Sequence, residues 1–130
     1  MTNKPFKSWE DIQEMCQSNT SWSSRKTKKF LEIVEISYLN RKKDLKDYAD
    51  EIGITPNGLY KNCERIIQVS PSYCVYARIV FEVCNILRED CTYQAKEIAD
   101  KLDMDTYHFS KFFKTHTGQT FRSFRKEFSK

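Results

Sequence analysis

The sequence is poor in the residues that make tight turns: its 130 residues include three glycines and three prolines. An all-strand protein needs many such turns, so this scarcity favours helices joined by short loops. No apolar stretch approaches the roughly 20 residues that span a membrane, and the N-terminus lacks the apolar segment of a signal peptide. We therefore expect an all-α, cytoplasmic protein with no membrane partner.

Residues typical of catalytic and metal sites are also scarce. The five cysteines form no Cys-x-x-Cys pair and no even-numbered disulfide framework, so we expect small buried side chains in a reducing compartment and no metal. There are two histidines, no Gly-rich phosphate loop and no nucleophile motif. We expect no enzymatic activity and no cofactor.

What the chain does have is a repeat with an offset of fifty residues. The first copy carries Ala49, Ile52, Ile54, Thr55, Leu59 and Lys61, and the second carries Ala99, Leu102, Met104, Asp105, Phe109 and Lys111. Each copy predicts two helices joined by a short turn, with a small alanine where the second helix crosses the first. DNA presents its major groove once per turn, so a monomer with two such helix-turn-helix units could read two successive grooves.

Capping residues place the helices around this repeat. Ser8 predicts a short helix to about residue 17, followed by a polar linker to Ser24 and an amphipathic helix over 27–40. Asp44 and Gly53 bound the first supporting helix, and Thr55 with Pro56 starts the helix that it presents.

The second half repeats this plan after a longer helix. Residues 71 to about 89 predict a helix roughly 25 Å long, which can space the two units. A supporting helix over 96–102 and a presented helix from 106 to about 114 follow, and Thr117-Gly118 ends the presented helix. Thr120 caps a last helix. The predicted organisation is a short helix and linker (1–26), a first unit (27–70), a linker helix (71–90) and a second unit (91–130).

The net charge of +4 is unevenly distributed. Residues 25–65 sum to +3 and residues 105–130 to +4, whereas residues 1–24 and 66–104 are net negative. Excess positive charge around both presented helices suits a polyanionic partner, although an ordinary solvated face has the same composition.

The second copy also resembles the DNA-binding region of the AraC/XylS family of bacterial transcription regulators. It contains Ile98-Ala99, then Phe-Ser-Lys-x-Phe-Lys over 109–114, then Gly118 and an aromatic residue followed by Arg. The resemblance covers residues 30–130 and implies homeodomain-like three-helix units joined by a linker helix, with Arg78 at a position where the family commonly has Arg. It implies sequence-specific binding to double-stranded DNA and activation through RNA polymerase. Family members often carry a sensor domain, for which the forty or so preceding residues leave no room, so we expect a stand-alone regulator or a piece of a longer protein.

The chain departs from the family pattern at several positions. Asp103 takes the place of the usual glycine in the second turn, which predicts a left-handed residue there. Phe121 replaces a proline at the last helix. In the first unit Cys63 replaces an aromatic residue, Gln68 replaces a glycine, and Gly58 weakens the presented helix. The first unit is therefore expected to bind more weakly or less selectively.

The resemblance assigns DNA contacts by position. Those expected to face bases are Asn57, Tyr60, Lys61, Tyr107, His108 and Lys111, with Ser110 on the same face. Asn can pair with adenine, Lys with guanine, and an aromatic edge with the thymine methyl group. Those expected near phosphates are Lys43, Lys96, Lys114 and Arg122. Arg125 could touch DNA or hold the last helix. A helical protein-protein interaction module with a degenerate first unit is the alternative function.

Overall fold

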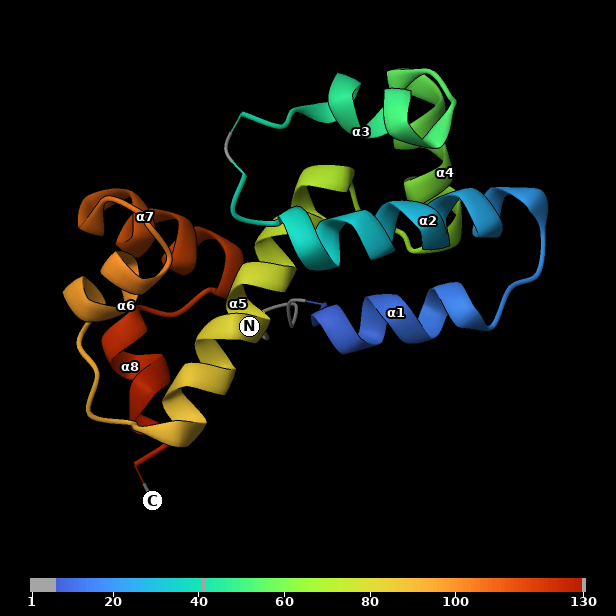
Figure 1. Cartoon of the computed structure of the whole chain (residues 1–130). Coiled ribbons are helices and arrows are strands. Elements are labelled where there is room, and N and C mark those ends of the chain that lie inside the picture. The colour runs from blue at the N-terminus through green and yellow to red at the C-terminus, as the bar shows by residue number, and fades with distance from the viewer. Residues whose placement is uncertain (1–6, 41, 130) are drawn as a thin grey trace. The chain divides into compact units, whose positions relative to one another are not determined.

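The computed structural model describes residues 7–40 and 42–129, and within them it contains eight α-helices and no strand (Figure 1). The helices are α1 (Trp9–Gln17), α2 (Trp22–Ser37), α3 (Leu45–Ile52), α4 (Pro56–Ile66), α5 (Pro71–Glu89), α6 (Ala95–Lys101), α7 (Thr106–Thr117) and α8 (Phe121–Lys126). The all-α prediction is confirmed. Contacts divide the described residues into an N-terminal unit (residues 7–79) and a C-terminal unit (residues 80–129), with the division inside α5.

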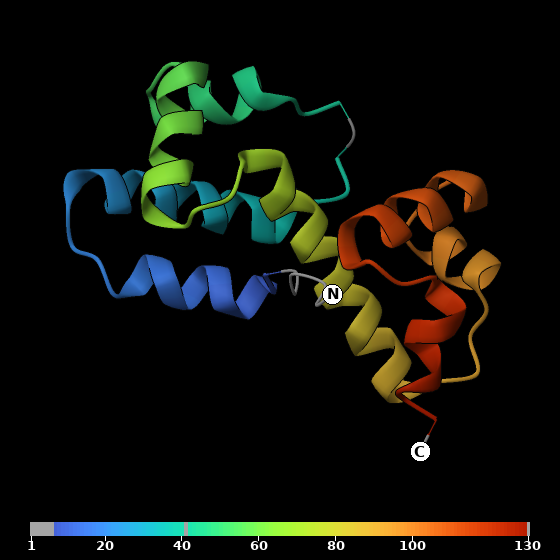
Figure 2. The ribbon, with the colours of Figure 1, turned by 180° about the vertical axis from the view of Figure 1, so that it is seen from behind.

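The N-terminal unit is built on a pair of adjacent helices. α1 and α2 lie side by side and run in opposite directions, and α4 crosses α2 steeply (Figures 1 and 2). Ser8 caps α1 in a reciprocal arrangement with Asp11, as the sequence predicts for the start of this helix. Trp9 and Ile12 of α1 are buried with Phe30 of α2, so α1 contributes directly to the core of this unit.

The predicted polar linker is wrong at its C-terminal end. It was expected to continue to Ser24, but α2 begins at Trp22 with Ser21 as its N-cap. The Ser24 hydroxyl donates to the carbonyl of Asn19 at 2.7 Å, and the Thr27 hydroxyl donates to the carbonyl of Ser23 at 2.8 Å. Because these small polar side chains are buried with their hydrogen bonds made locally, the first turn of α2 carries no apolar pattern in the sequence.

α3 begins and ends, and α4 begins, where the sequence predicts. Asp44 caps α3 reciprocally with Asp47, and Gly53 ends it in the left-handed conformation with φ +83°. Thr55 caps α4 by accepting from the amide of Gly58 at 3.0 Å, and Pro56 is its first residue. The Ile54 amide donates to the carbonyl of Ala49 at 3.1 Å, which closes the turn between the two helices.

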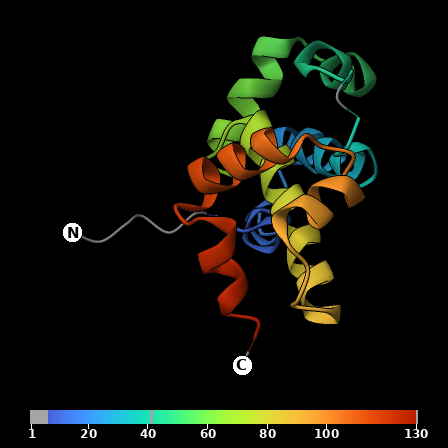
Figure 3. The same ribbon diagram turned by 90° about the vertical axis from the view of Figure 1, so that its left-hand side faces the viewer.

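The C-terminal unit repeats this backbone arrangement in α6 and α7. Asp103 is left-handed with φ +54°, as predicted, and the Met104 amide donates to the carbonyl of Ala99 at 2.8 Å. Asp105 caps α7 through the amide of His108 at 3.1 Å. α7 continues past residue 114 to Thr117, and the left-handed Gly118 ends it, as the Thr117-Gly118 pair predicts. Figure 3 shows α8 running steeply across the direction of α7.

Phenylalanines fill the core of the C-terminal unit. Phe113 lies edge-on to Phe121 and Phe124, with ring centroids 5.7 and 5.0 Å apart, and Phe109 meets Phe121 at 5.5 Å. Edge-to-face contacts at these distances stabilise a packed core beyond the burial of apolar area alone. The rings therefore fix α8 against α7.

All five cysteines are free thiols. Cys16, Cys63 and Cys74 are buried as predicted, whereas Cys84 and Cys91 are half-buried. No helix within the described ranges has both the length and the apolar character needed to cross a membrane.

Candidate nucleic-acid interface

The outer face of α7 is continuously exposed, polar and basic. Phe109 and Phe113 point into the core, which turns the intervening positions outward at helical spacing. Tyr107 is 67% exposed, and the Lys111 ammonium lies 5.9 Å from the centre of its ring. This helix contains no acidic residue, and Lys111 and Lys114 make its face positively charged from its middle toward its C-terminal end.

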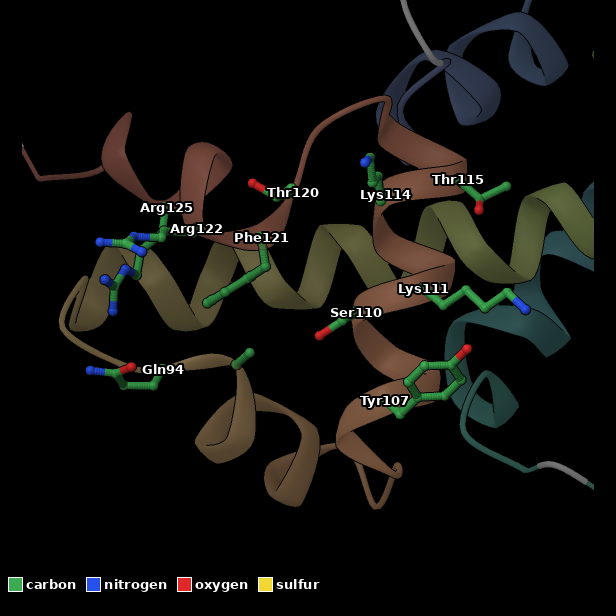
Figure 4. Close-up of a pocket in the computed structure, with 11 residues that line it drawn as sticks. Gln94, Tyr107, Ser110, Lys111, Lys114, Thr115, Thr120, Phe121, Arg122 and Arg125 are labelled. Atoms are coloured by element: carbon green, nitrogen blue, oxygen red, sulfur yellow. The ribbon is translucent and has the colours of Figure 1, made fainter.

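A groove of about 800 Å³ runs beside this face, between α7, α8 and the start of α6 (Figure 4). Its lining residues are Gln94, Ala95, Tyr107, Ser110, Lys111, Lys114, Thr115, Thr120, Phe121, Arg122 and Arg125. Figure 4 shows Ser110 pointing toward the space between α7 and α8, while the two arginines of α8 lie close together near Gln94. The lining supplies four cations and no carboxylate, which makes the groove suited to an anionic ligand.

Arg125 serves the fold as well as the groove. Its Nη1 donates to the carbonyl oxygens of Thr92 and Tyr93 at 3.3 and 3.0 Å. These bonds tie α8 to the segment that precedes α6. Arg125 therefore holds the last helix in place while its charge stays at the groove wall.

The groove brings together only part of the predicted C-terminal set. Tyr107, Ser110, Lys111, Lys114 and Arg122 line it together, all exposed to solvent. Two other predicted residues are exposed but lie outside the lining: His108, whose Nδ1 is 3.9 Å from a carboxylate oxygen of Asp105, and Lys96 on α6. Sequence reasoning did not single out Gln94, Thr115 or Thr120, which reach the groove through the packing of three helices.

In the N-terminal unit, α4 presents its predicted residues outward. Asn57, Tyr60 and Lys61 are exposed, with Tyr60 44% accessible. Lys43 differs from this set, because its side chain is only 12% exposed, is ion-paired with Glu51 and lies 5.0 Å over the ring of Tyr48. Its charge is engaged within the unit, so it is a poor candidate for a phosphate contact.

The N-terminal unit also has a pocket near the start of α3 and of α5. It has a volume of about 220 Å³ and is lined by Phe30, Lys43, Asp44, Leu45, Tyr48, Pro71, Ser72, Val75 and Tyr76. Most of these side chains are apolar or aromatic. This pocket therefore lacks the cationic lining of the groove beside α7.

One histidine of α7, His116, carries no charge near neutral pH. His116, in the last turn of the helix, is partly buried, and burial lowers its pKa to about 4. The positive charge of α7 therefore comes from its lysines. Among the described residues no group of three or more side chains is arranged to hold a metal ion.

Comparisons of the chain with protein-family models, with curated proteins and with solved structures found no match. The chain's own residues and their geometry therefore carry the functional conclusion.

Proposed function

We propose that the chain is a sequence-specific regulator of transcription that binds double-stranded DNA. The observation that carries this proposal is the exposed face of α7 beside a groove with four cations and no carboxylate. An α-helix fits the major groove of B-DNA, and cations flanking such a helix can contact the phosphates on either side of it. The absence of acidic side chains from the lining means that no fixed charge there repels a phosphate.

The repeated backbone supports two such units. The pairs α3–α4 and α6–α7 share a left-handed residue in the turn, and α3, α4 and α7 each begin at an N-cap whose side chain accepts from a backbone amide. In our proposal each pair is a helix-turn-helix unit, and α4 and α7 enter successive major grooves. The resemblance of residues 30–130 to AraC/XylS regulators points the same way. A regulator of this kind would act as a monomer in the cytoplasm, without a cofactor, and would activate transcription through RNA polymerase.

The exposed side chains have chemistry suited to reading bases. Asn57 can pair with adenine, and Lys61 and Lys111 can donate to the acceptors of guanine. Tyr107 offers a ring edge to a thymine methyl group, and Ser110 can donate or accept. Lys114 and Arg122 suit the phosphates that flank such a reading helix.

Selection of bound sites from a random pool of DNA duplexes tests the proposal. We expect an enriched site, an affinity that falls steeply as salt rises, and a loss of about 1–3 kcal/mol for that site on Lys111→Ala. Lys29→Ala, which removes an exposed lysine from α2, is the matched control and should change little. A pool with no enriched site, or an affinity that does not respond to salt, would contradict the proposal.

A second candidate function, binding a protein partner, is favoured by α2. Ile36 is 87% exposed and Trp22 is 56% exposed on this helix, and a protein partner could cover these apolar side chains. In this alternative the fold is kept, but the first unit no longer serves DNA binding. Absent or salt-independent DNA binding, together with loss of partner capture in Ile36→Ser, would favour it.

A further inference from the structure

The fifty-residue repeat allows the cationic groove to be compared, position by position, with the N-terminal unit. Gln94 corresponds to Asp44, Lys114 to Glu64, Arg122 to Ser72, Arg125 to Val75, Thr115 to Arg65 and Lys111 to Lys61. The positions that line the C-terminal groove therefore carry four cations, whereas the corresponding positions of the N-terminal unit carry two cations and two carboxylates, whose charges cancel. One cationic position alone, that of Lys61 and Lys111, is charged alike in both units.

The corresponding place in the N-terminal unit exists but has different chemistry. Five residues of its 220 Å³ pocket correspond to groove residues: Asp44, Leu45, Pro71, Ser72 and Val75. The cation at its edge, Lys43, is already ion-paired with Glu51. The carboxylate of Asp44 accepts from the Asp47 amide at 3.0 Å, and backbone hydrogen bonds lower its pKa, so it stays negative at neutral pH. A phosphate would meet apolar side chains and a fixed negative charge there.

We infer that the contacts to the phosphates of the DNA backbone come chiefly from the groove of the C-terminal unit, and not from the corresponding pocket of the N-terminal unit. The groove beside α7 takes a phosphodiester strand, with Lys114 and Arg122 contacting phosphates and Arg125 positioning α8. The N-terminal unit contributes base contacts from α4 and little affinity for the backbone. This inference rests on the proposed function, because it assigns the phosphate contacts of the same DNA complex to one of its two units.

Charge exchange between corresponding positions tests the inference, because each double exchange leaves the net charge unchanged. Lys114 and Glu64 are both exposed, as are Arg122 and Ser72, so substitutions at these positions do not disturb the core. The variants are Lys114→Glu, Glu64→Lys and the double exchange, with Arg122→Ser, Ser72→Arg and their double exchange as an independent pair. The probe is a DNA duplex of mixed sequence and about 25 base pairs, long enough to offer two successive major grooves.

Each exchange has a defined expectation. Lys114→Glu should weaken binding about tenfold at ~0.15 M salt and reduce the slope of log affinity against log salt by about one. Glu64→Lys should change affinity less than about twofold, because a single lysine there has no cationic groove around it. The double exchange should stay as weak as Lys114→Glu, although its net charge equals that of the natural chain. The arginine pair should behave in the same way, with about a fivefold loss in Arg122→Ser.

Other results would overturn the inference. If either double exchange restores the original affinity, net charge rather than the groove governs backbone binding. If Lys114→Glu and Arg122→Ser bind as the natural chain does, the groove holds no phosphates. Tighter binding to an RNA duplex of the same sequence would show that double-stranded DNA is the wrong occupant.

The outcomes also separate this inference from the proposed function. Loss of binding in Lys114→Glu without any enriched site in the random pool would support the groove and contradict sequence-specific regulation. If a site is enriched and both double exchanges bind it as tightly as the natural chain does, the regulator function is supported. The assignment of the phosphate contacts to the C-terminal unit is then contradicted.

Discussion

The two units share their helix caps and left-handed turns, but different residues build their apolar cores. Cys63 of the N-terminal unit corresponds to Phe113 of the C-terminal unit, and all of their side-chain surface is buried in both. The N-terminal unit compensates for the smaller thiol with an additional helix, α1, which buries Trp9 in the same core as Phe30 of α2. Among its described residues the C-terminal unit has no counterpart of α1, and it relies on its phenylalanine rings. The comparison teaches that one backbone plan can be stabilised by added elements or by larger side chains.

The N-terminal unit contains a cluster of polar contacts around Glu35 and Arg78, and the corresponding place in the C-terminal unit is apolar. Glu35 accepts from Trp9 Nε1 at 3.2 Å and from Arg78 Nε at 2.6 Å, and the guanidinium lies 4.1 Å over the ring of Tyr38. These contacts tie α1, α2 and α5 together. Phe128 corresponds to Arg78 and packs against Phe124 instead, with ring centroids 5.6 Å apart. The same position of the repeat therefore stabilises the N-terminal unit through a charged side chain and the C-terminal unit through packing of aromatic rings.

The largest expected effect is on the aromatic core. Phe113→Ala should lower the free energy of unfolding of the C-terminal unit by about 3–5 kcal/mol, because it removes a ring in contact with four others. Cys63→Ala should cost only about 1 kcal/mol in the N-terminal unit, since a small thiol leaves a small cavity. Both tryptophans lie in the N-terminal unit. Urea unfolding followed by tryptophan fluorescence therefore reports on that unit, and circular dichroism reports on both.

In Phe113→Ala the circular-dichroism transition should move to lower urea while the fluorescence transition stays. Equal shifts of both signals would mean that the two units unfold together, and the contrast between their cores would lose its thermodynamic meaning.

A smaller effect concerns pH. The unfolded chain binds a proton at His116 below about pH 6.5, whereas the folded chain does so only near pH 4, because burial lowers the pKa of the ring. Acidification from pH 6.5 to 4 should therefore destabilise the C-terminal unit. Solvent screening at this partly buried site reduces the expected loss to on the order of 1–2 kcal/mol. The corresponding residue of the N-terminal unit is the buried Ile66, which does not titrate.

His116→Ile copies the N-terminal unit and serves as the matched variant. Thermal unfolding at several pH values should show a weaker acid dependence in this variant than in the natural chain. Identical pH profiles would show that His116 titrates alike in the folded and unfolded states.

The smallest expected effect concerns the turns. Each unit has two left-handed residues, and each uses glycine at a different one: Gly53 and Gln68 in the N-terminal unit, Asp103 and Gly118 in the C-terminal unit. A side chain raises the energy of this conformation, so Gln68→Gly should stabilise its unit by about 0.5–1 kcal/mol. Gly118→Gln should destabilise the other unit by a similar amount. The space beside Gly118 is open, so conformation rather than a clash sets that cost.

Chemical denaturation measures both changes. A loss of stability in Gln68→Gly would indicate that the glutamine side chain stabilises its turn by more than the left-handed conformation costs.

Much of the fold could be predicted because its signals are local. Asp44, Thr55 and Asp105 bond to amides three residues away, so each cap is readable from a short segment. The exposed face of α7 was predictable too, since Phe109 and Phe113 mark the opposite side of the same helix. The start of α2 was missed because buried hydroxyl groups, rather than apolar residues, line its first turn.

The candidate site was less accessible to sequence reasoning. In the sequence Lys43 has the pattern of an exposed surface cation. In the structure it is ion-paired with Glu51 and lies over the ring of Tyr48. The sequence left two roles for Arg125, touching DNA or holding the last helix. Its hydrogen bonds to the carbonyls of Thr92 and Tyr93 define the second of these. Gln94 carried no signal of its own, because it reaches the groove through the packing of α6 against α7.

By itself, the sequence determined the helical class, the repeat, the caps and the face that each presented helix turns outward. These features depend on hydrogen bonds and burial patterns within one or two turns of helix, so neighbouring residues suffice to specify them. Tertiary structure alone decided which cations remain available and that four of them line one groove. Such pairings join side chains from different elements, and only the folded backbone brings their charges close enough to attract or to cancel.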